Sequence, residues 1–256
     1  MLPEIVIDPR FLVTDTGTSD GTQIKYYFEG KWYKVDRYGG EGACEELASK
    51  IMELSGLDRC EYVQYDRVVI NGEDGCVSDS FLSPGERFFT VYRLHLNTIG
   101  TDPAIVTSRM DYDDAIEYIV SFVKEQTGID IRKYLANTFM LDSLLLNEDR
   151  HFNNLGLVYD GTDFRPAPIF DNGKSLFIGN SRYSPEKDIK ENKSVAFAKA
   201  FSGSFELNRD YLMSYSSFSP DFSKIKKYLR TKDLSSDNIY SRLYKLCNLY
   251  SGNKNT

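Results

Sequence analysis

The N-terminal third of the chain alternates polar positions with β-branched and aromatic ones, the spacing typical of β-strands. The segments KYYFEG and KWYKVD meet after Glu29 and Gly30, which predicts a β-hairpin, and EYVQYDRVVI and RFFTVYRL predict further strands. Between them, residues 41–57 have helical spacing and end near a glycine, with an apolar face that consists of Ala43, Leu47, Ile51 and Leu54.

Helical spacing dominates the rest of the chain. Residues 111–128 begin with acidic side chains, which suit the positive end of a helix dipole, and residues 129–146 predict a second helix directly after them. Two short strands, LGLVY and FRPAPIF, are predicted on either side of Asp160 and Gly161. The helical pattern returns in KIKKYLR and NIYSRLYKLCNLY.

This change of period indicates an α+β protein with two lobes. A β-rich N-lobe is expected over residues 1–93 and a mainly helical C-lobe over residues 94–256. Proteins built this way often bind their ligand in the cleft between the lobes.

Composition and charge narrow the classes of partner. The 256 residues are 41% hydrophobic and 27% charged, and the formal net charge of −7 disfavours nucleic acid and anionic membrane as direct partners. The N-terminus lacks a signal-peptide pattern, and no apolar run approaches the ~20 residues of a membrane span. Four cysteines without metal-binding spacing predict free core thiols in a reducing cytoplasm.

Two polar clusters, NEDRHFNN and FDNG, stand between apolar stretches at residues 147–154 and 170–173. Asp149, Asn154 and Asp171 supply two carboxylates and an amide oxygen, the hard ligands that Mg²⁺ prefers when phosphate also holds it. An Asp followed five positions later by an Asn, and then by an Asp near a Gly, is the order of kinase active sites. A hydrolytic metal centre built on His151 is the weaker alternative, since the chain has only two histidines and no HExxH motif.

These segments resemble two branches of kinases, the phosphatidylinositol-kinase-like group and the bacterial HipA-like serine/threonine kinases of toxin–antitoxin systems. The HipA-like resemblance is closer and covers roughly residues 15–180. The segments that carry it are WYKVDRYGGEGACEELASKI, GCVSDSFL, FFTVYRLH, LDSLLLNEDRHFNN and PIFDNGKSL.

The resemblance implies a nucleotide site in the N-lobe. Lys34 would contact the α- and β-phosphates of ATP and pair with Glu41 or Glu45, of which Glu41 fits the family pattern slightly better. Thr90 and Tyr92, in the segment that leads to the hinge, join the expected nucleotide-binding residues.

A phosphate-binding loop is expected at residues 16–25. Gly17 and Gly21 would let backbone N–H groups approach phosphate oxygens. HipA-like kinases carry in this loop a serine whose phosphorylation ejects the loop from the site, and Thr18 or Ser19 stands in that place.

The C-lobe residues receive distinct expected roles. Asp149 would orient the acceptor hydroxyl or act as its base, and Asn154 and Asp171 would hold Mg²⁺. His151 aligns with a HipA-like histidine near the phosphates, and a structural hydrogen-bonding role stays open for it. Asp142, a carboxylate on an apolar helix face, is expected to accept hydrogen bonds from N–H groups of the catalytic loop.

The sequence therefore predicts a Mg-ATP-dependent kinase that phosphorylates Ser or Thr of protein and also itself. A small-molecule or lipid kinase and a nucleotide-binding pseudokinase that acts as an interaction module are the alternatives. The resemblance further implies an antitoxin or other regulatory chain as a partner, besides the protein substrate.

Overall fold

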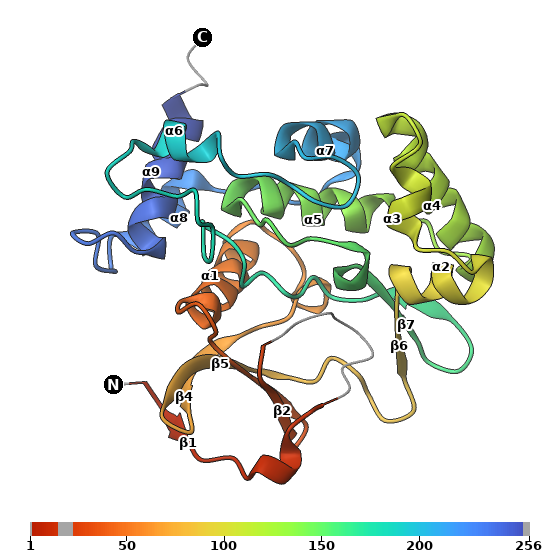
Figure 1. Ribbon diagram of the computed structural model, residues 1–256, viewed down its shortest axis with the longest axis horizontal. Helices are drawn as coiled ribbons and strands as arrows, with labels where there is room; N and C mark the ends of the chain where they lie inside the picture. Colours follow the sequence, from red (N-terminus) through yellow and green to blue (C-terminus); the bar gives the residue numbers. More distant parts are fainter. Residues whose placement is uncertain (1, 15–22, 253–256) are drawn as a thin grey trace.

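A five-stranded sheet forms the N-terminal part of the computed structural model, which describes residues 2–14 and 23–252 (Figure 1). The strand order is β1-β4-β5-β3-β2, in which β1 and β4 are parallel and the other neighbours are antiparallel. The strands are β1 (Glu4–Ile5), β2 (Lys25–Phe28), β3 (Lys31–Val35), β4 (Asp66–Ile70) and β5 (Glu73–Asp79).

The predicted hairpin is confirmed as β2 and β3. Glu29 and Gly30 form its two-residue turn with φ of 49° and 75°, the left-handed values that turns of this length need. This turn sets the register, so that Lys25 lies directly opposite Lys34. Residues directly opposite each other share one face of the sheet, and both lysines are buried.

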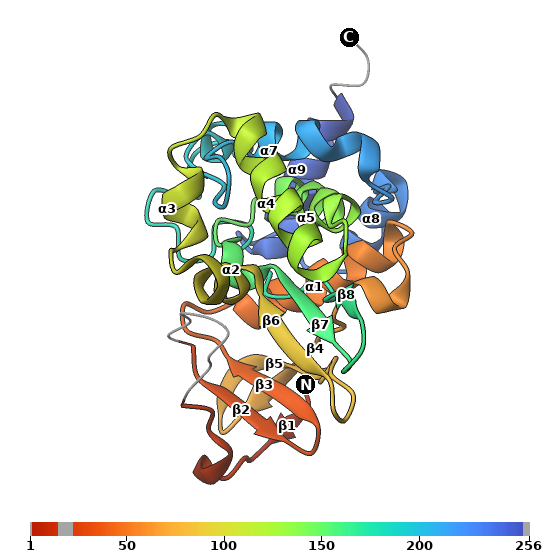
Figure 2. The same ribbon diagram turned by 90° about the vertical axis from the view of Figure 1, so that its right-hand side faces the viewer.

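Helix α1 (Glu41–Leu54) follows β3 and confirms the helix predicted at residues 41–57. The carboxylate of Asp36 starts it by accepting hydrogen bonds from the backbone N–H groups of Gly40 and Gly42 at 2.6 and 2.7 Å. In Figures 1 and 2, α1 lies between the N-terminal sheet and the helical part. Leu47 and Ile51 of α1 belong to the large core cluster that includes α5 and α9.

A second sheet connects the two halves of the sequence. It has the antiparallel order β6-β7-β8, made of β6 (Arg87–Thr90), β7 (Gly156–Tyr159) and β8 (Phe164–Pro166). The predicted strand pair around Asp160 and Gly161 is confirmed. The prediction that RFFTVYRL is one strand is wrong beyond Thr90, because the Thr90 hydroxyl accepts a hydrogen bond from Arg93 N–H and starts a helix at Val91.

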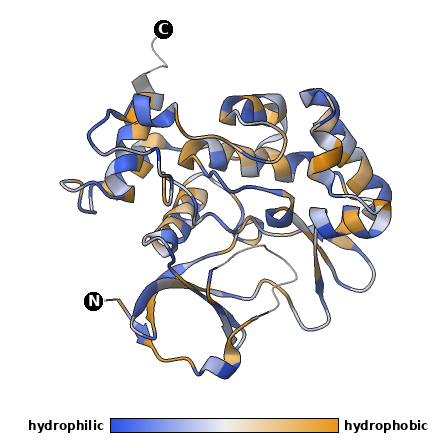
Figure 3. Ribbon diagram, viewed as in Figure 1, coloured by the Kyte–Doolittle hydropathy of each residue, from blue (hydrophilic) through white to orange (hydrophobic). Residues whose placement is uncertain are grey.

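Helices make up most of the remaining chain, and Figure 3 shows hydrophobic and hydrophilic residues side by side along them. The long helices predicted at residues 111–128 and 129–146 are confirmed. The helices after β6 are α2 (Val91–Ile99), α3 (Pro103–Thr107), α4 (Tyr112–Thr127), α5 (Arg132–Leu145), α6 (Ile189–Lys193), α7 (Phe205–Leu212), α8 (Phe222–Leu229) and α9 (Ile239–Gly252). The division into lobes at residue 93 stays a prediction.

Two further expectations concern membrane spans and cysteine thiols. Within the described part of the chain, no helix combines the length and the apolar character needed to cross a membrane. The cysteines are free thiols, as predicted, but Cys60 is exposed and so does not belong to the core.

Gly42 allows α1 to approach β5 closely, and Gly75 allows β5 to approach β3. A Cβ atom at Gly42 would lie 2.6 Å from the carbonyl carbon and oxygen of Gly75, and a Cβ at Gly75 would lie 2.2 Å from the backbone oxygen of Lys34. Such distances are far below van der Waals contact, and backbone atoms of a central strand have little freedom to move. The contact therefore sets the position of α1, and with it Glu45, relative to Lys34.

We expect Gly42→Ala to destabilise the fold by roughly 2 kcal/mol. Helix propensity alone would give a gain of about 1 kcal/mol, but the methyl group would overpack against the strand backbone. Gly203→Ala is the matched control, since its Cβ would meet open space, and it should change the free energy of unfolding by less than about 1 kcal/mol. Urea denaturation measures both. A Gly42→Ala protein as stable as the wild type would contradict the close approach.

Candidate active site

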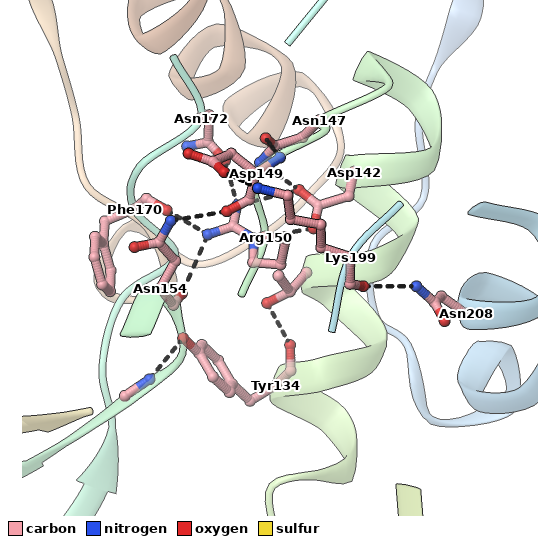
Figure 4. Close-up of polar contacts among 12 residues, drawn as sticks. Tyr134, Asp142, Asn147, Asp149, Arg150, Asn154, Phe170, Asn172, Lys199 and Asn208 are labelled. Carbon is pink, nitrogen blue, oxygen red and sulfur yellow. Dashed lines mark hydrogen bonds and ion pairs between the residues drawn. The ribbon is translucent and has the colours of Figure 1, made fainter. Parts of the chain in front are cut away.

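The loop after α5 is organised around Arg150, whose side chain is 1% exposed. Its Nε and Nη2 donate to the two carboxylate oxygens of Asp142 on α5 at 2.9 and 3.1 Å (Figure 4). Asn147 Nδ2 donates to the same carboxylate at 3.0 Å. The expectation that Asp142 accepts hydrogen bonds from N–H groups of the loop is therefore confirmed, and the donors are the side chains of Arg150 and Asn147.

Arg150 also binds the segment that contains Asp171. Its Nη1 donates to the backbone oxygen of Phe170 at 2.6 Å and to that of Asn154 at 3.2 Å, and its Nη2 donates to Asn172 Oδ1 at 2.7 Å. One guanidinium thus joins the end of α5, the loop that holds Asp149 and Asn154, and both neighbours of Asp171 (Figure 4). The planar, five-donor geometry of arginine makes such a four-way junction feasible.

The N-terminal sheet reaches the same segment through Lys34. Its Nζ lies 2.8 Å from Glu45 Oε1 and 3.0 Å from Asp171 Oδ1. Glu45, which is 1% exposed, also accepts a hydrogen bond from the backbone N–H of Asn172 at 2.9 Å. Glu45 and Asn172 therefore connect Lys34 to the Arg150 junction.

The preference for Glu41 as the partner of Lys34 is wrong. Glu41 Oε1 instead accepts hydrogen bonds from the backbone N–H groups of Arg37 and Tyr38 at 3.1 and 2.8 Å, which holds the turn between β3 and α1. Glu41 and Glu45 are one helical turn apart on α1. Glu41 is hydrogen-bonded to the loop before the helix, so Glu45 is the one that pairs with Lys34.

Charges in the site stabilise one another. Burial alone would lower the pKa of the Lys34 ammonium, but Asp171 and Glu45 outweigh it and hold this pKa well above its usual value. Burial would likewise raise the pKa of Asp171, but Lys34 and then Lys25 hold it well below the usual range. Both groups are therefore ionised at neutral pH.

A cleft of about 200 Å³ collects four of the predicted site residues, Glu41, Asp149, Asn154 and Asp171. The other residues that line it come from β2 and the residues before it, the turn between β3 and α1, and the segment after Asp171, and they are Gln23, Lys25, Arg37, Tyr38, Gly173 and Lys174. The two polar clusters of the sequence thus meet in one cleft, as their spacing indicated.

Asn154 and Asp171 fit a metal bound together with phosphate. Asn154 Nδ2 donates to the backbone oxygen of Asp149 at 3.0 Å, while its Oδ1 is buried and has no hydrogen-bond partner among the described residues. A buried amide oxygen without a donor is costly unless a cation or water binds it. No three His, Cys, Asp or Glu side chains of the described residues gather in a cluster that could hold a metal, so Mg²⁺ would need oxygens of a ligand as well.

Other predicted residues lie elsewhere. Thr90 is completely buried and its hydroxyl donates to Asn153 Oδ1 at 3.2 Å, so its side chain is not available to a nucleotide. Tyr92 is half-buried and packs against the large core. His151 borders a second hollow, and burial lowers the pKa of its imidazole. The predicted loop residues, Gly17, Thr18, Ser19 and Gly21, lie outside the described residues.

Sequence reasoning missed four cations of the site, one of which is Arg37 at the cleft. Lys25 lines the cleft beside Lys34, and the two-residue turn of the predicted hairpin already implied that pairing. Lys174 also lines the cleft, with its Nζ 3.8 Å from the centre of the Tyr38 ring. Lys199 forms an ion pair with Asp149 from fifty positions further along the chain, and no local pattern indicated it.

The fold and the cleft define a protein with a kinase-like α+β fold, as predicted from the sequence. The structure is similar to the proinflammatory kinase CtkA of Helicobacter pylori, with a TM-score of 0.64 and 16% identity over 98% of this chain and 94% of that one. It is also similar to a chain in the complex of toxin–antitoxin proteins HipA and HipB with operator DNA from Shewanella oneidensis MR-1, with a TM-score of 0.48 and 13% identity over 94% of this chain and 63% of that one. No family model and no curated protein sequence matches the chain.

We expect Arg150→Met to destabilise the protein by about 3–5 kcal/mol, because it leaves the Asp142 carboxylate buried without its cation. Arg165→Met is the matched control, since Arg165 is 45% exposed in its ion pair with Glu86, and its loss should stay below about 1 kcal/mol. Urea denaturation compares the two variants. Similar unfolding midpoints for both would contradict the central position of Arg150.

Proposed function

We propose that the chain is a Mg-ATP-dependent phosphotransferase that phosphorylates Ser or Thr hydroxyl groups of protein, its own N-terminal segment included. The observation that carries this proposal is the cleft that combines Asp149, Asn154 with its unpartnered buried oxygen, and Asp171 beside Lys34. The likeness to a kinase fold supports the same class of reaction.

Cations at the cleft suit a nucleoside triphosphate. Lys25 and Lys34 lie opposite each other on β2 and β3, and Arg37 and Lys174 stand at the same cleft. These positive charges lie together although the whole chain carries a net charge of −7. They would hold the phosphate oxygens and offset their charge.

Asn154 Oδ1 and the Asp171 carboxylate would hold Mg²⁺ against those phosphates. Mg²⁺, when bound, neutralises charge on the transferred phosphoryl group and fixes its orientation. The backbone of Asp171 is in the left-handed region with φ of 61°, a costly conformation that the bonds of Arg150 to both neighbouring residues maintain.

Asp149 would act on the acceptor. Its carboxylate lies in the same cleft as Asn154 and Asp171. There it could orient a hydroxyl group and accept its proton while that oxygen bonds to the terminal phosphorus of ATP, the bond from this phosphorus to the bridging oxygen breaks, and ADP leaves. Autophosphorylation at Thr18 or Ser19 stays a prediction, as do the protein substrate, a regulatory partner chain and the cytoplasmic location.

Intact-mass analysis after incubation with Mg-ATP tests the proposal. We expect the wild type to gain at least one phosphoryl group, which peptide mapping should place within residues 14–25. Asp149→Asn should slow this gain by about 10²–10⁴-fold with little change in ATP affinity, because the carboxylate acts on the acceptor hydroxyl. Asp171→Ala should abolish the Mg²⁺-dependent gain.

Asp163→Asn, an exposed position in the turn between β7 and β8, is the control and should behave as the wild type. A wild type that binds ATP but transfers no phosphoryl group, to itself or to added protein, would favour a nucleotide-binding pseudokinase. Transfer by Asp149→Asn at the wild-type rate would remove the assigned role of Asp149.

A further inference from the structure

Asp149, whose carboxylate would orient the acceptor hydroxyl, forms an ion pair with Lys199. Lys199 Nζ lies 2.5 Å from Asp149 Oδ1, and the two side chains are 40% and 35% exposed (Figure 4). A pair this exposed to water contributes at most about 1 kcal/mol to stability. Holding the fold together therefore does not explain why the chain places a lysine there.

The segment around Lys199 is built to hold this lysine in place. Ala198 N–H donates to the backbone oxygen of Gly203 at 2.9 Å, which closes residues 198–203 into a tight loop. Asn208 on α7 also holds the loop, because its Nδ2 donates hydrogen bonds to the backbone oxygens of Lys199 and Ser202 at 3.3 and 3.4 Å. The backbone at Lys199 is thus held by the hydrogen bond between Ala198 and Gly203 and by those from Asn208.

Packing and strain point to the same conclusion. Phe201 anchors the loop by edge-on contacts with Phe139 of α5 and Phe152 of the catalytic loop, with ring centres 5.9 and 5.3 Å apart. Ala200, next to Lys199, has φ of 74°, a left-handed conformation that costs a non-glycine residue about 1–2 kcal/mol. The chain keeps this strained residue next to an ion pair that contributes little stability, which is the pattern of a functional constraint.

Lys199 also lies on the boundary between two hollows. Asp149 lines the cleft that holds Asn154 and Asp171, whereas Lys199 and His151 line a second hollow of about 410 Å³. The small side chains Ala104 and Thr107 of α3, and Ser108 directly after it, also line that hollow.

We propose that Lys199 is a positioning residue for phosphotransfer, which acts by holding the Asp149 carboxylate in the orientation that receives the acceptor hydroxyl. This inference rests on the proposed function. It differs from an assignment of Lys199 to ATP binding, because Lys199 is absent from the residues that line the cleft with Lys25, Arg37 and Lys174.

The test measures the rate of autophosphorylation by intact mass at saturating Mg-ATP, together with the ATP concentration that gives half the maximal rate. Lys199→Met should lower the maximal rate by about 10–100-fold, since small misplacements of a reacting group cost this much, and should leave the half-saturating ATP concentration within about twofold. Lys199→Arg should recover a large part of the rate, because a guanidinium can also pair with the carboxylate. Lys190→Met, an exposed lysine on α6, is the control and should match the wild type.

A double-mutant cycle separates positioning from a direct effect on phosphate. In the Asp149→Asn background, Lys199→Met should have almost no further effect, because its action passes through the carboxylate. A full multiplicative loss in that background would overturn the positioning role, and so would a Lys199→Met protein as fast as or faster than the wild type. An inactive wild type would instead remove the proposed function itself, so the two failures are distinguishable.

Discussion

The buried guanidinium of Arg150 is the interaction on which the rest of the site depends. A charge this deep in the protein is strongly unfavourable unless partners surround it, and Arg150 has four of them: the Asp142 carboxylate, the Asn172 amide and the backbone oxygens of Asn154 and Phe170. Those partners come from α5, the loop after it and the segment around Asp171. Satisfying one buried cation therefore fixes the relative positions of Asp149, Asn154 and Asp171.

The same junction extends into the N-terminal sheet. Asn172 accepts from Arg150 with its side chain and donates from its backbone to Glu45, which in turn pairs with Lys34. The close approach of α1 to β5 at Gly42 sets where Glu45 lies. A continuous polar network thus runs from β3 to α5, and Lys34 and the loop that holds Asp149 and Asn154 belong to one connected unit.

Much of this arrangement could be predicted where a local rule decides the outcome. The two-residue turn at Glu29 and Gly30 determines the β2–β3 register, and helical spacing located α1, α4 and α5. The choice between Glu41 and Glu45 could not be predicted, because both lie on one face of α1 and hydrogen bonds of the preceding turn decide between them.

Other features depend on contacts that are distant in sequence. The strand pattern of RFFTVYRL continues past Thr90. The Thr90 hydroxyl nevertheless caps a helix, and α2 begins at Val91. The short helices α3 and α6, of five residues each, have too few turns to show a clear period. Lys199 reaches Asp149 only because the packing of Phe201 and the brace from Asn208 hold its loop there.

We propose that this network presents Asn154 and Asp171 as a site for Mg²⁺ bound together with ATP. Calorimetric titration of the full chain with ATP, in Mg²⁺ and in a chelator, tests this role. We expect Mg²⁺ to tighten ATP binding, and we expect Asn154→Ala to lose this gain because it lacks the buried amide oxygen that has no hydrogen-bond partner among the described residues. The variant should remain folded. Equal ATP affinities in Mg²⁺ and in chelator, or an undiminished gain in Asn154→Ala, would contradict this role.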